Sequence, residues 1–187
     1  MAGFGLRIAR SMGMEGFTGN TFEYPIDPEN TNLIFSGDPV ILNGGFMEEV
    51  SGNTPGAITP GPILGAFSGC RYVAANGDYE FERYWDGGAG RAEIFGMVSM
   101  PAHSRFYVKG TSGVDYQQAL VNSRFALNYA DGSPQYGDSR VSLGAVDASG
   151  AAQLHGLAPL PNNVWGTDEP ILEISIVAQQ GSAADVA

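Results

Sequence analysis

The stretch Pro62–Trp85, PILGAFSGCRYVAANGDYEFERYW, decides the fold that we expect for this chain. It contains an apolar run, Ile63–Ala75, followed by an alternating run, Asp78–Trp85, and the dipeptide Asn76-Gly77 lies between them. Asn-Gly accepts positive φ at both central positions of a type I′ turn, which joins two antiparallel strands. The stretch therefore predicts a β-hairpin, and we expect this hairpin to be the central element of a sheet.

The side chains of the predicted hairpin divide between two faces, because successive residues of a strand point in opposite directions. We expect Glu80 and Glu82 to face solvent. Cys70, the only cysteine in the chain, is expected to be a small buried apolar side chain and not a reactive thiol. Four large side chains are expected to pack in the core or between subunits: Phe67, Tyr72, Phe81 and Trp85.

Composition favours an all-β protein. The 187 residues include 27 Gly and 11 Pro but a single lysine, Lys109, a composition that suits turns and short strands better than surface helices. Short alternating segments separated by turn residues predict a compact β-barrel, β-tulip or β-sandwich. We expect one short helix at Asp115–Val121, an extended N-terminal arm at residues 1–20, a single β domain at residues 21–178 and a flexible tail at residues 179–187.

Charge and hydropathy exclude two classes of partner. The net charge is −11 and the isoelectric point is about 4.4. An acidic surface repels phosphate backbones, and we find no concentrated basic patch, so we expect no nucleic-acid partner. No apolar run reaches the length of a membrane span or of a signal peptide, so we expect no membrane partner and a protein made in the cytosol.

The residues needed for catalysis or metal binding do not occur in a recognisable pattern. His103 and His155 lie far apart, without a further His or Cys at ligand spacing. No Gly-x-Ser-x-Gly elbow and no phosphate-binding glycine motif occurs. We therefore predict that the protein is not an enzyme, and we expect no catalytic residue, no metal and no cofactor.

Acidic and aromatic residues leave one alternative open. Neighbouring residues of a strand point to opposite faces, so the adjacent pairs Glu48-Glu49 and Asp168-Glu169 do not form the facing carboxylates of a glycosidase. Carboxylates from separate strands can still converge, and Trp85 or Trp165 would then stack on a sugar ring. A carbohydrate-binding role thus stays possible on sequence grounds.

The arm and two loops are the segments that we expect to contact partners. Phe4, Leu6 and Ile8 alternate with small or basic residues, a pattern that suits a strand added to another chain's sheet edge. The loops Ser51–Pro62 and Pro159–Pro170 are long and rich in proline. The predicted contact residues for a partner or sister subunit are Phe4, Leu6, Arg7, Ile8, Arg10, Ile58, Pro60, Pro161, Asn162 and Trp165.

Turn-and-strand segments follow one another in a particular order along nearly the whole chain. They are GFGLR at 3–7, GDPV at 37–40, ILGAF at 63–67 with GCRY at 69–72, GDSRVSL at 137–143, LHGL at 154–157 leading to PNN at 161–163, and ILEISI at 171–176. This order resembles that of small structural proteins of tailed bacteriophages, in particular the head decoration or capsid cement proteins of marine phages.

The resemblance implies a non-enzymatic, β-rich protein that binds the major capsid protein and stabilises contacts between its subunits. It also implies a homo-oligomer, with a trimer favoured, on the exterior of the virion capsid after assembly in the host cytoplasm. Arg7 and Arg10 would then pair with capsid carboxylates. Two other functions stay open: a carbohydrate-binding β-sandwich module with weak glycan binding for host adhesion, and a minor tail or connector protein.

Overall fold

The computed structural model describes residues 4–11, 21–50, 55–58, 62–101 and 104–180. The chain is nearly all β, which confirms the predicted fold class. Where a short helix was expected, a single 3-10 turn occupies Gln118–Leu120. The strands are β1 (Arg7–Ser11), β2 (Thr21–Pro25), β3 (Pro39–Asn43), β4 (Phe46–Glu49), β5 (Gly56–Ala57), β6 (Gly65–Val73), β7 (Tyr79–Glu82), β8 (Ala92–Ser99), β9 (Ser104–Gly110), β10 (Arg124–Tyr129), β11 (Ser142–Val146), β12 (Ala152–Leu157) and β13 (Ile171–Ile176).

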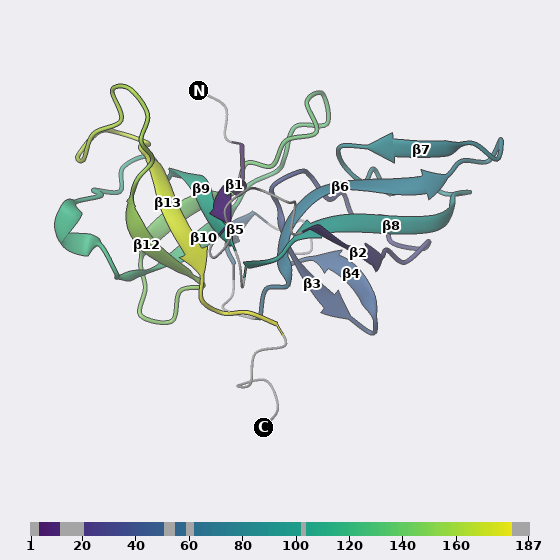
Figure 1. Ribbon diagram of the computed structural model, residues 1–187, viewed down its shortest axis with the longest axis horizontal. Helices are drawn as coiled ribbons and strands as arrows, with labels where there is room; N and C mark the ends of the chain where they lie inside the picture. The colour runs from purple at the N-terminus through teal and green to yellow at the C-terminus, as the bar shows by residue number, and fades with distance from the viewer. Residues whose placement is uncertain (1–3, 12–20, 51–54, 59–61, 102–103, 181–187) are drawn as a thin grey trace.

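One sheet closes into a barrel of five strands in the order β9-β11-β10-β12-β13, with β13 returning to β9 (Figure 1). The β9–β11 pair is parallel and the other pairs are antiparallel. Two more strands extend this sheet, since β1 pairs with β9 and β5 pairs with β10. Strand closure removes the free edges that an open sheet would expose.

Alternation along the barrel strands creates the barrel core. In β9 every second residue, including Phe106 and Val108, is buried, and the residues between them are half-buried. Phe125, Leu127 and Leu172 fill the same interior from the other strands. Each such large apolar side chain contributes about 1.5–3 kcal/mol when it is fully removed from water, so this interior is a main source of stability.

The second sheet contains the predicted hairpin. Its strand order is β2-β8-β6-β3-β4, and β7 pairs with β6 as the second hairpin strand. The connecting turn differs from the expected type I′ turn, because Gly77 has a positive φ of 88° whereas Asn76 does not. The Gly77 N–H donates to the Ala74 carbonyl, and the Ala74 N–H donates to the Asp78 carbonyl. This is a three-residue connection with glycine in the left-handed position.

Three of the four predicted core residues of the hairpin are buried. Phe67, Tyr72 and Trp85 are at most 1% exposed, as predicted. Phe81 is 69% exposed, so it does not pack in the core of the chain, and its packing between subunits stays a prediction. The exposure arises because β7 extends beyond the core, and all four of its residues are exposed. Glu80 lies on the opposite side of β7, where it accepts a hydrogen bond from the Tyr72 hydroxyl at 2.9 Å.

Residues 4–11, expected to be part of a free arm, belong to the chain's own barrel sheet. Leu6 is only 3% exposed within the barrel core, and its N–H donates to the Gly37 carbonyl at 2.9 Å. Strand β1 follows directly and pairs with β9, with Arg7 opposite Tyr107. The alternating apolar residues therefore cover an edge within the same molecule. Residues 12–20 of the expected arm lie outside the described residues.

The start of the expected tail is also fixed to the β domain. Gln180 bonds to the backbone of Leu42 in β3 in both directions, because its Oε1 accepts from the Leu42 N–H and its Nε2 donates to the Leu42 carbonyl. The Ile63 N–H donates to the Ala178 carbonyl, and the Gln180 N–H donates to the Ile63 carbonyl. Residues 181–187 lie outside the described residues.

Candidate interaction site

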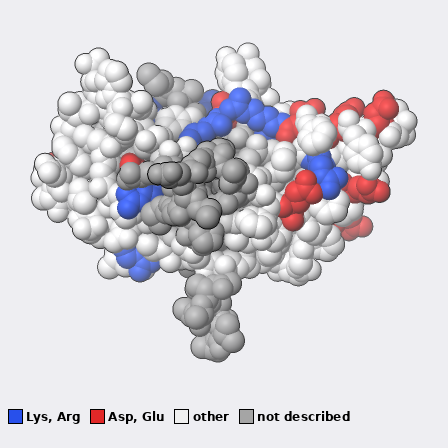
Figure 2. All heavy atoms as spheres, viewed as in Figure 1, with Lys and Arg blue, Asp and Glu red and all other residues white. Residues whose placement is uncertain are grey.

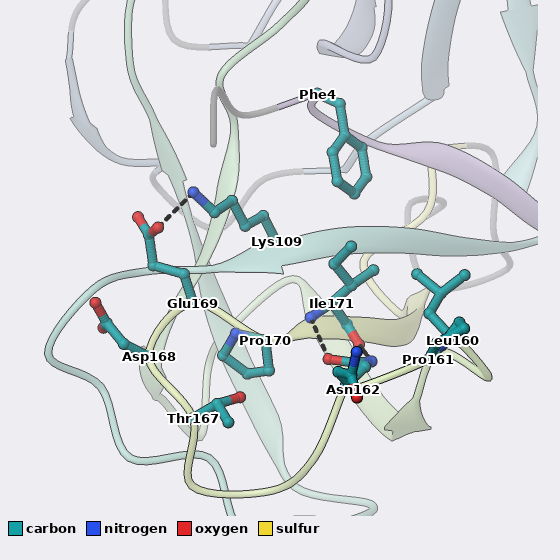
Figure 3. Close-up of a pocket in the computed structure, with 11 residues that line it drawn as sticks. Phe4, Lys109, Leu160, Pro161, Asn162, Thr167, Asp168, Glu169, Pro170 and Ile171 are labelled. Atoms are coloured by element: carbon teal, nitrogen blue, oxygen red, sulfur yellow. Dashed lines mark hydrogen bonds and ion pairs between the residues drawn. The ribbon is translucent and has the colours of Figure 1, made fainter.

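A pocket of about 530 Å³ lies on the barrel where the N-terminal segment meets the loop between β12 and β13. Figure 3 shows Phe4 pointing from the N-terminal segment toward Leu160 and Ile171. Pro161 and Asn162 line the same pocket. The structure thus brings together three residues that were predicted as contacts on two segments far apart in the sequence: Phe4, Pro161 and Asn162.

The side chain of Asn163 holds the base of this loop. Its Oδ1 accepts a hydrogen bond from the Ile171 N–H at 3.0 Å, and its Nδ2 donates to the carbonyls of Ile171 at 2.7 Å and Ala158 at 2.9 Å. Asn162 and Glu169 have positive φ angles of 61° and 53°. The loop was predicted from its length and prolines, but the role of Asn163 was missed. Its only sequence signal is that asparagine can donate and accept at once.

Charged residues lie at one side of the pocket and engage one another. Lys109 Nζ of β9 is 2.5 Å from Glu169 Oε2 (Figure 3). The neighbouring Asp168 accepts hydrogen bonds from the Ser112 hydroxyl and the Gly113 N–H. The two adjacent carboxylates therefore serve separate partners and form no facing pair. The apolar part of the lining, with Leu160 44% exposed, suits the insertion of an apolar side chain.

Two of the other predicted contact residues lie in the barrel core. Leu6 and Ile58 are at most 5% exposed, so neither side chain reaches a partner surface. Ile8 and Trp165 are half-buried and pack against the same core. Their burial follows from tertiary contacts that alternation and loop composition do not encode.

The predicted contact arginines lie on β1. The Arg7 side chain forms an ion pair with Asp138 and also donates to the Phe4 carbonyl. Arg10 lies opposite Arg105 in the β1–β9 register. Pro60 lies outside the described residues. The N-terminal segment therefore offers Phe4 at the pocket, while Arg7 is already engaged within the chain.

Trp85 cannot act as the sugar-stacking platform that the carbohydrate-binding alternative would need. Its side chain is 0% exposed, its indole Nε1 donates to the Asn30 carbonyl at 3.0 Å, and its ring packs edge-on against Tyr72. Sugar stacking needs an accessible ring face, which Trp85 does not offer. The described residues contain no group of three or more His, Cys, Asp or Glu side chains placed to hold a metal ion.

A fully buried carboxyl, Asp38, lies where the turn before β3 meets β6. Its Oδ2 accepts from the Phe35 N–H at 2.7 Å, and its backbone carbonyl accepts from the Phe67 N–H. Burial raises the pKa of Asp38 to about 7, the neighbouring Glu49 charge adds to the rise, and hydrogen bonds from Ser139 and Phe35 oppose it. The sequence showed only a turn at this position.

Exposed aromatic side chains on the second sheet were also missed. Tyr79 and Phe81 on β7 are 62% and 69% exposed, and Phe22 on β2 is 52% exposed. The available signal was the alternation of aromatic and acidic residues in β7, which was interpreted as a half-buried strand. A strand that extends past its core shows the same pattern.

Comparisons with known proteins identify no relative, because no family model, no curated protein and no solved structure matches this chain. Among the described residues, no helix has both the length and the apolar character needed to cross a membrane. Fold and surface chemistry therefore carry the functional argument.

Proposed function

We propose that this protein is a capsid decoration or cement protein that binds the outer surface of a phage head and stabilises contacts between major capsid protein subunits. The observation that carries the proposal is the pocket between Phe4 and the β12–β13 loop, where two predicted contact segments meet. The order of turn-and-strand segments, which resembles that of such proteins, supports the same function. A homo-oligomer, with a trimer favoured, belongs to this proposal.

The pocket suits this role because its walls are fixed before a partner arrives. Asn163 ties the loop base to Ile171, and Phe4 lies two residues before the buried Leu6. A preformed site loses little conformational entropy on binding. Insertion of one large apolar side chain from a capsid subunit contributes about 1.5–3 kcal/mol, and multivalent attachment multiplies such modest contacts.

Net charge supports the outer surface of the shell over the inner one. The chain carries 20 carboxylates against nine basic residues. Packaged DNA is a dense array of phosphates, which repels an acidic protein. An acidic protein on the exterior avoids this repulsion.

A charged substitution in the pocket tests the proposal. Leu160→Asp should abolish binding to purified shells that lack the protein, because it places a charge in the apolar pocket. Leu160 is 44% exposed, so the variant should keep the thermal stability of the parent. Val146→Asp is the matched control, since Val146 is 53% exposed on β11 and lies outside the pocket. Equal binding by both variants would reject the pocket as the contact site.

Copy number separates this function from that of a minor tail or connector protein. A decoration protein occurs at a large fraction of the capsid lattice positions, whereas a tail or connector protein occurs in a few copies per particle. Quantitative mass spectrometry of purified particles measures this ratio to the major capsid protein. A low ratio would assign the protein to the tail or connector.

A further inference from the structure

We propose that β7 and the adjoining face of the second sheet bind an extended segment of another protein whose side chains alternate between basic and apolar. The apolar and aromatic part of this surface, here called the aromatic face, consists of Arg71, Val73, Tyr79, Phe81, Phe95 and Met97. The inference goes beyond the proposed function, because β7 lies at the opposite end of the molecule from the β12–β13 loop that lines the pocket (Figure 1).

Strand β7 has one paired edge. Its four residues pair with β6, from Tyr79 opposite Val73 to Glu82 opposite Cys70. Within the described part of the chain, no other strand pairs with β7. Figure 1 shows the β6–β7 hairpin projecting away from the barrel. An exposed edge offers backbone donors and acceptors to which an extended segment can add as a further strand.

The aromatic face has the chemistry of a protein interface. The register places Tyr79 and Phe81 beside Val73 and Arg71 on one side of the sheet. At 62% and 69%, they have the highest exposed fractions among the large apolar side chains in the described ranges. Aromatic residues and arginine are enriched at the centres of protein interfaces, where they supply most of the binding energy. The alternate apolar side chains of an added strand would cover these rings.

Arg71, the cation of the aromatic face, is already held within the chain. The guanidinium carbon of Arg71 lies 4.5 Å from the centroid of the Phe95 ring. Its Nε and Nη2 donate to the two carboxylate oxygens of Glu23 at 2.9 and 2.7 Å. An aromatic ring with a bidentate carboxylate is a strong site for a guanidinium group. In the described part of the chain, Arg71 and Arg91 lie over the rings of Phe95, Tyr72 and Trp85 and not over those of Tyr79 and Phe81, which stay open to apolar side chains.

Charge complementarity selects the occupant of this surface. Residues 21–50 and 62–101, which include the second sheet, contain eleven carboxylates and three arginines. The other described ranges are nearly balanced, with seven carboxylates and six basic residues. Figure 2 shows acidic atoms gathered at the hairpin end of the molecule. Glu80 and Glu82 lie on the side of β7 opposite the rings. A second copy would bring like charges together, whereas a basic segment would pair with them.

The test uses a defined probe. A fluorescent peptide of Arg-Val repeats is titrated with the full-length protein at low salt, and binding is followed by fluorescence polarisation. A peptide of equal composition with its arginines and valines in separate blocks is the control. The alternating peptide should bind at least about tenfold more tightly, because only it places arginine and valine on opposite faces of an added strand.

Two variants test the aromatic side and the acidic side of β7 separately. Phe81→Ser should weaken binding of the alternating peptide at least about tenfold, as expected for a central aromatic residue of an interface. The double variant Glu80→Gln with Glu82→Gln should weaken binding and flatten its dependence on salt. Tyr136→Ser is the matched control, because Tyr136 is 61% exposed and lies in the β10–β11 loop. Circular dichroism checks that each variant is folded.

Three outcomes would overturn the inference. Equal affinity for the alternating and block peptides would mean that the protein binds the peptide through net charge alone and not as an added strand. Unchanged binding by Phe81→Ser would exclude the aromatic face. Self-association of the parent that Phe81→Ser abolishes, measured by sedimentation, would make a second copy the occupant. None of these outcomes bears on the pocket, whose shell-binding test with Leu160→Asp stands separately.

Discussion

Asp138 Oδ1 lies 2.6 Å from Nη2 of Arg83, which connects the loop between β10 and β11 to the chain that follows β7. The same oxygen also forms the ion pair with Arg7 of β1. One carboxylate therefore bridges an arginine from the barrel sheet and an arginine from the second sheet's hairpin. The bridge adds a charged contact where the two sheets meet.

Replacing the Asp138 carboxylate should lower the stability of the folded protein modestly. The Asp138 side chain is 26% exposed and Arg83 is 52% exposed, so water screens the pairs, and Asp138→Asn should lower the free energy of unfolding by about 1 kcal/mol. The loss should shrink at high salt. Urea unfolding at two salt concentrations measures both effects, with the exposed Asp131→Asn as control. Equal losses in the two variants would contradict a bridging role.

Deleting residues 1–10 should destabilise the fold. The deletion removes the buried Leu6 and most of β1, whose pairing covers β9. Leu6→Ala alone should cost about 2–5 kcal/mol, the range for large-to-small changes in a core, and the deletion should cost more. Thermal unfolding measures both, and Leu160→Ala on the exposed loop provides the comparison. An unchanged melting temperature after the deletion would restore the free-arm interpretation.

Protonation of Asp38 should make stability depend on pH. Its pKa in the folded protein is about 7 against an ordinary value of 3.8, so the folded state keeps the proton that the unfolded state loses. The contribution of Asp38 to the free energy of unfolding is therefore fully present below about pH 4. It is lost as the pH rises toward 7, and the total loss is roughly 4 kcal/mol. Asp38→Asn should show a flatter profile in urea unfolding between pH 4 and 8. Parallel profiles would exclude Asp38 as the cause.

Removing the amide of Asn163 should loosen the loop that forms the pocket. Asn163→Ala breaks three hydrogen bonds, and at about 1 kcal/mol each the cost should be about 2–3 kcal/mol. Faster hydrogen exchange of the Ile171 amide would report the loosening directly. Asn162→Gly is the control and should be nearly neutral, because glycine accepts the φ of 61° at that position. Slow Ile171 exchange in Asn163→Ala would contradict this role.

The Cys70 thiol should be inert in the folded protein. It is 0% exposed, and burial together with the charge of Glu82 raises its pKa to about 12. Iodoacetamide reacts with the thiolate, so labelling at pH 8 should be negligible until urea unfolds the protein. Mass spectrometry measures the labelled fraction. Rapid labelling without denaturant would show that β6 opens locally.

The strands and the hairpin could be predicted because their signals are local. Alternation in β9 and β13, and a glycine at Gly77, act over a few residues, so the all-β class followed from the sequence. The exposure of Phe81 could not be predicted from alternation, since it depends on where the core ends beneath β7. The pairing of Arg7 with Tyr107 is equally non-local.

The candidate site was predicted in its parts but not in its assembly. Alternation at Phe4 and the prolines near Pro161 predicted that two segments would contact a partner. Their meeting at one pocket depends on β1 lying along β9 and on Asn163 folding the loop back onto Ile171. Neither relationship leaves a pattern within either segment.

The β1–β9 pairing also imposes an order on folding during synthesis. Arg7 leaves the ribosome one hundred residues before its partner Tyr107, and β13, which joins the two ends of the barrel, is made later still. The apolar side chains of the N-terminal segment therefore stay exposed in the unfolded chain until β9 has been synthesised. Pairings between such distant residues slow folding to about milliseconds to seconds and prolong exposure to aggregation. We therefore expect that the need for chaperones in the producing cell depends on the slow pairing of the barrel strands and not on the local hairpin.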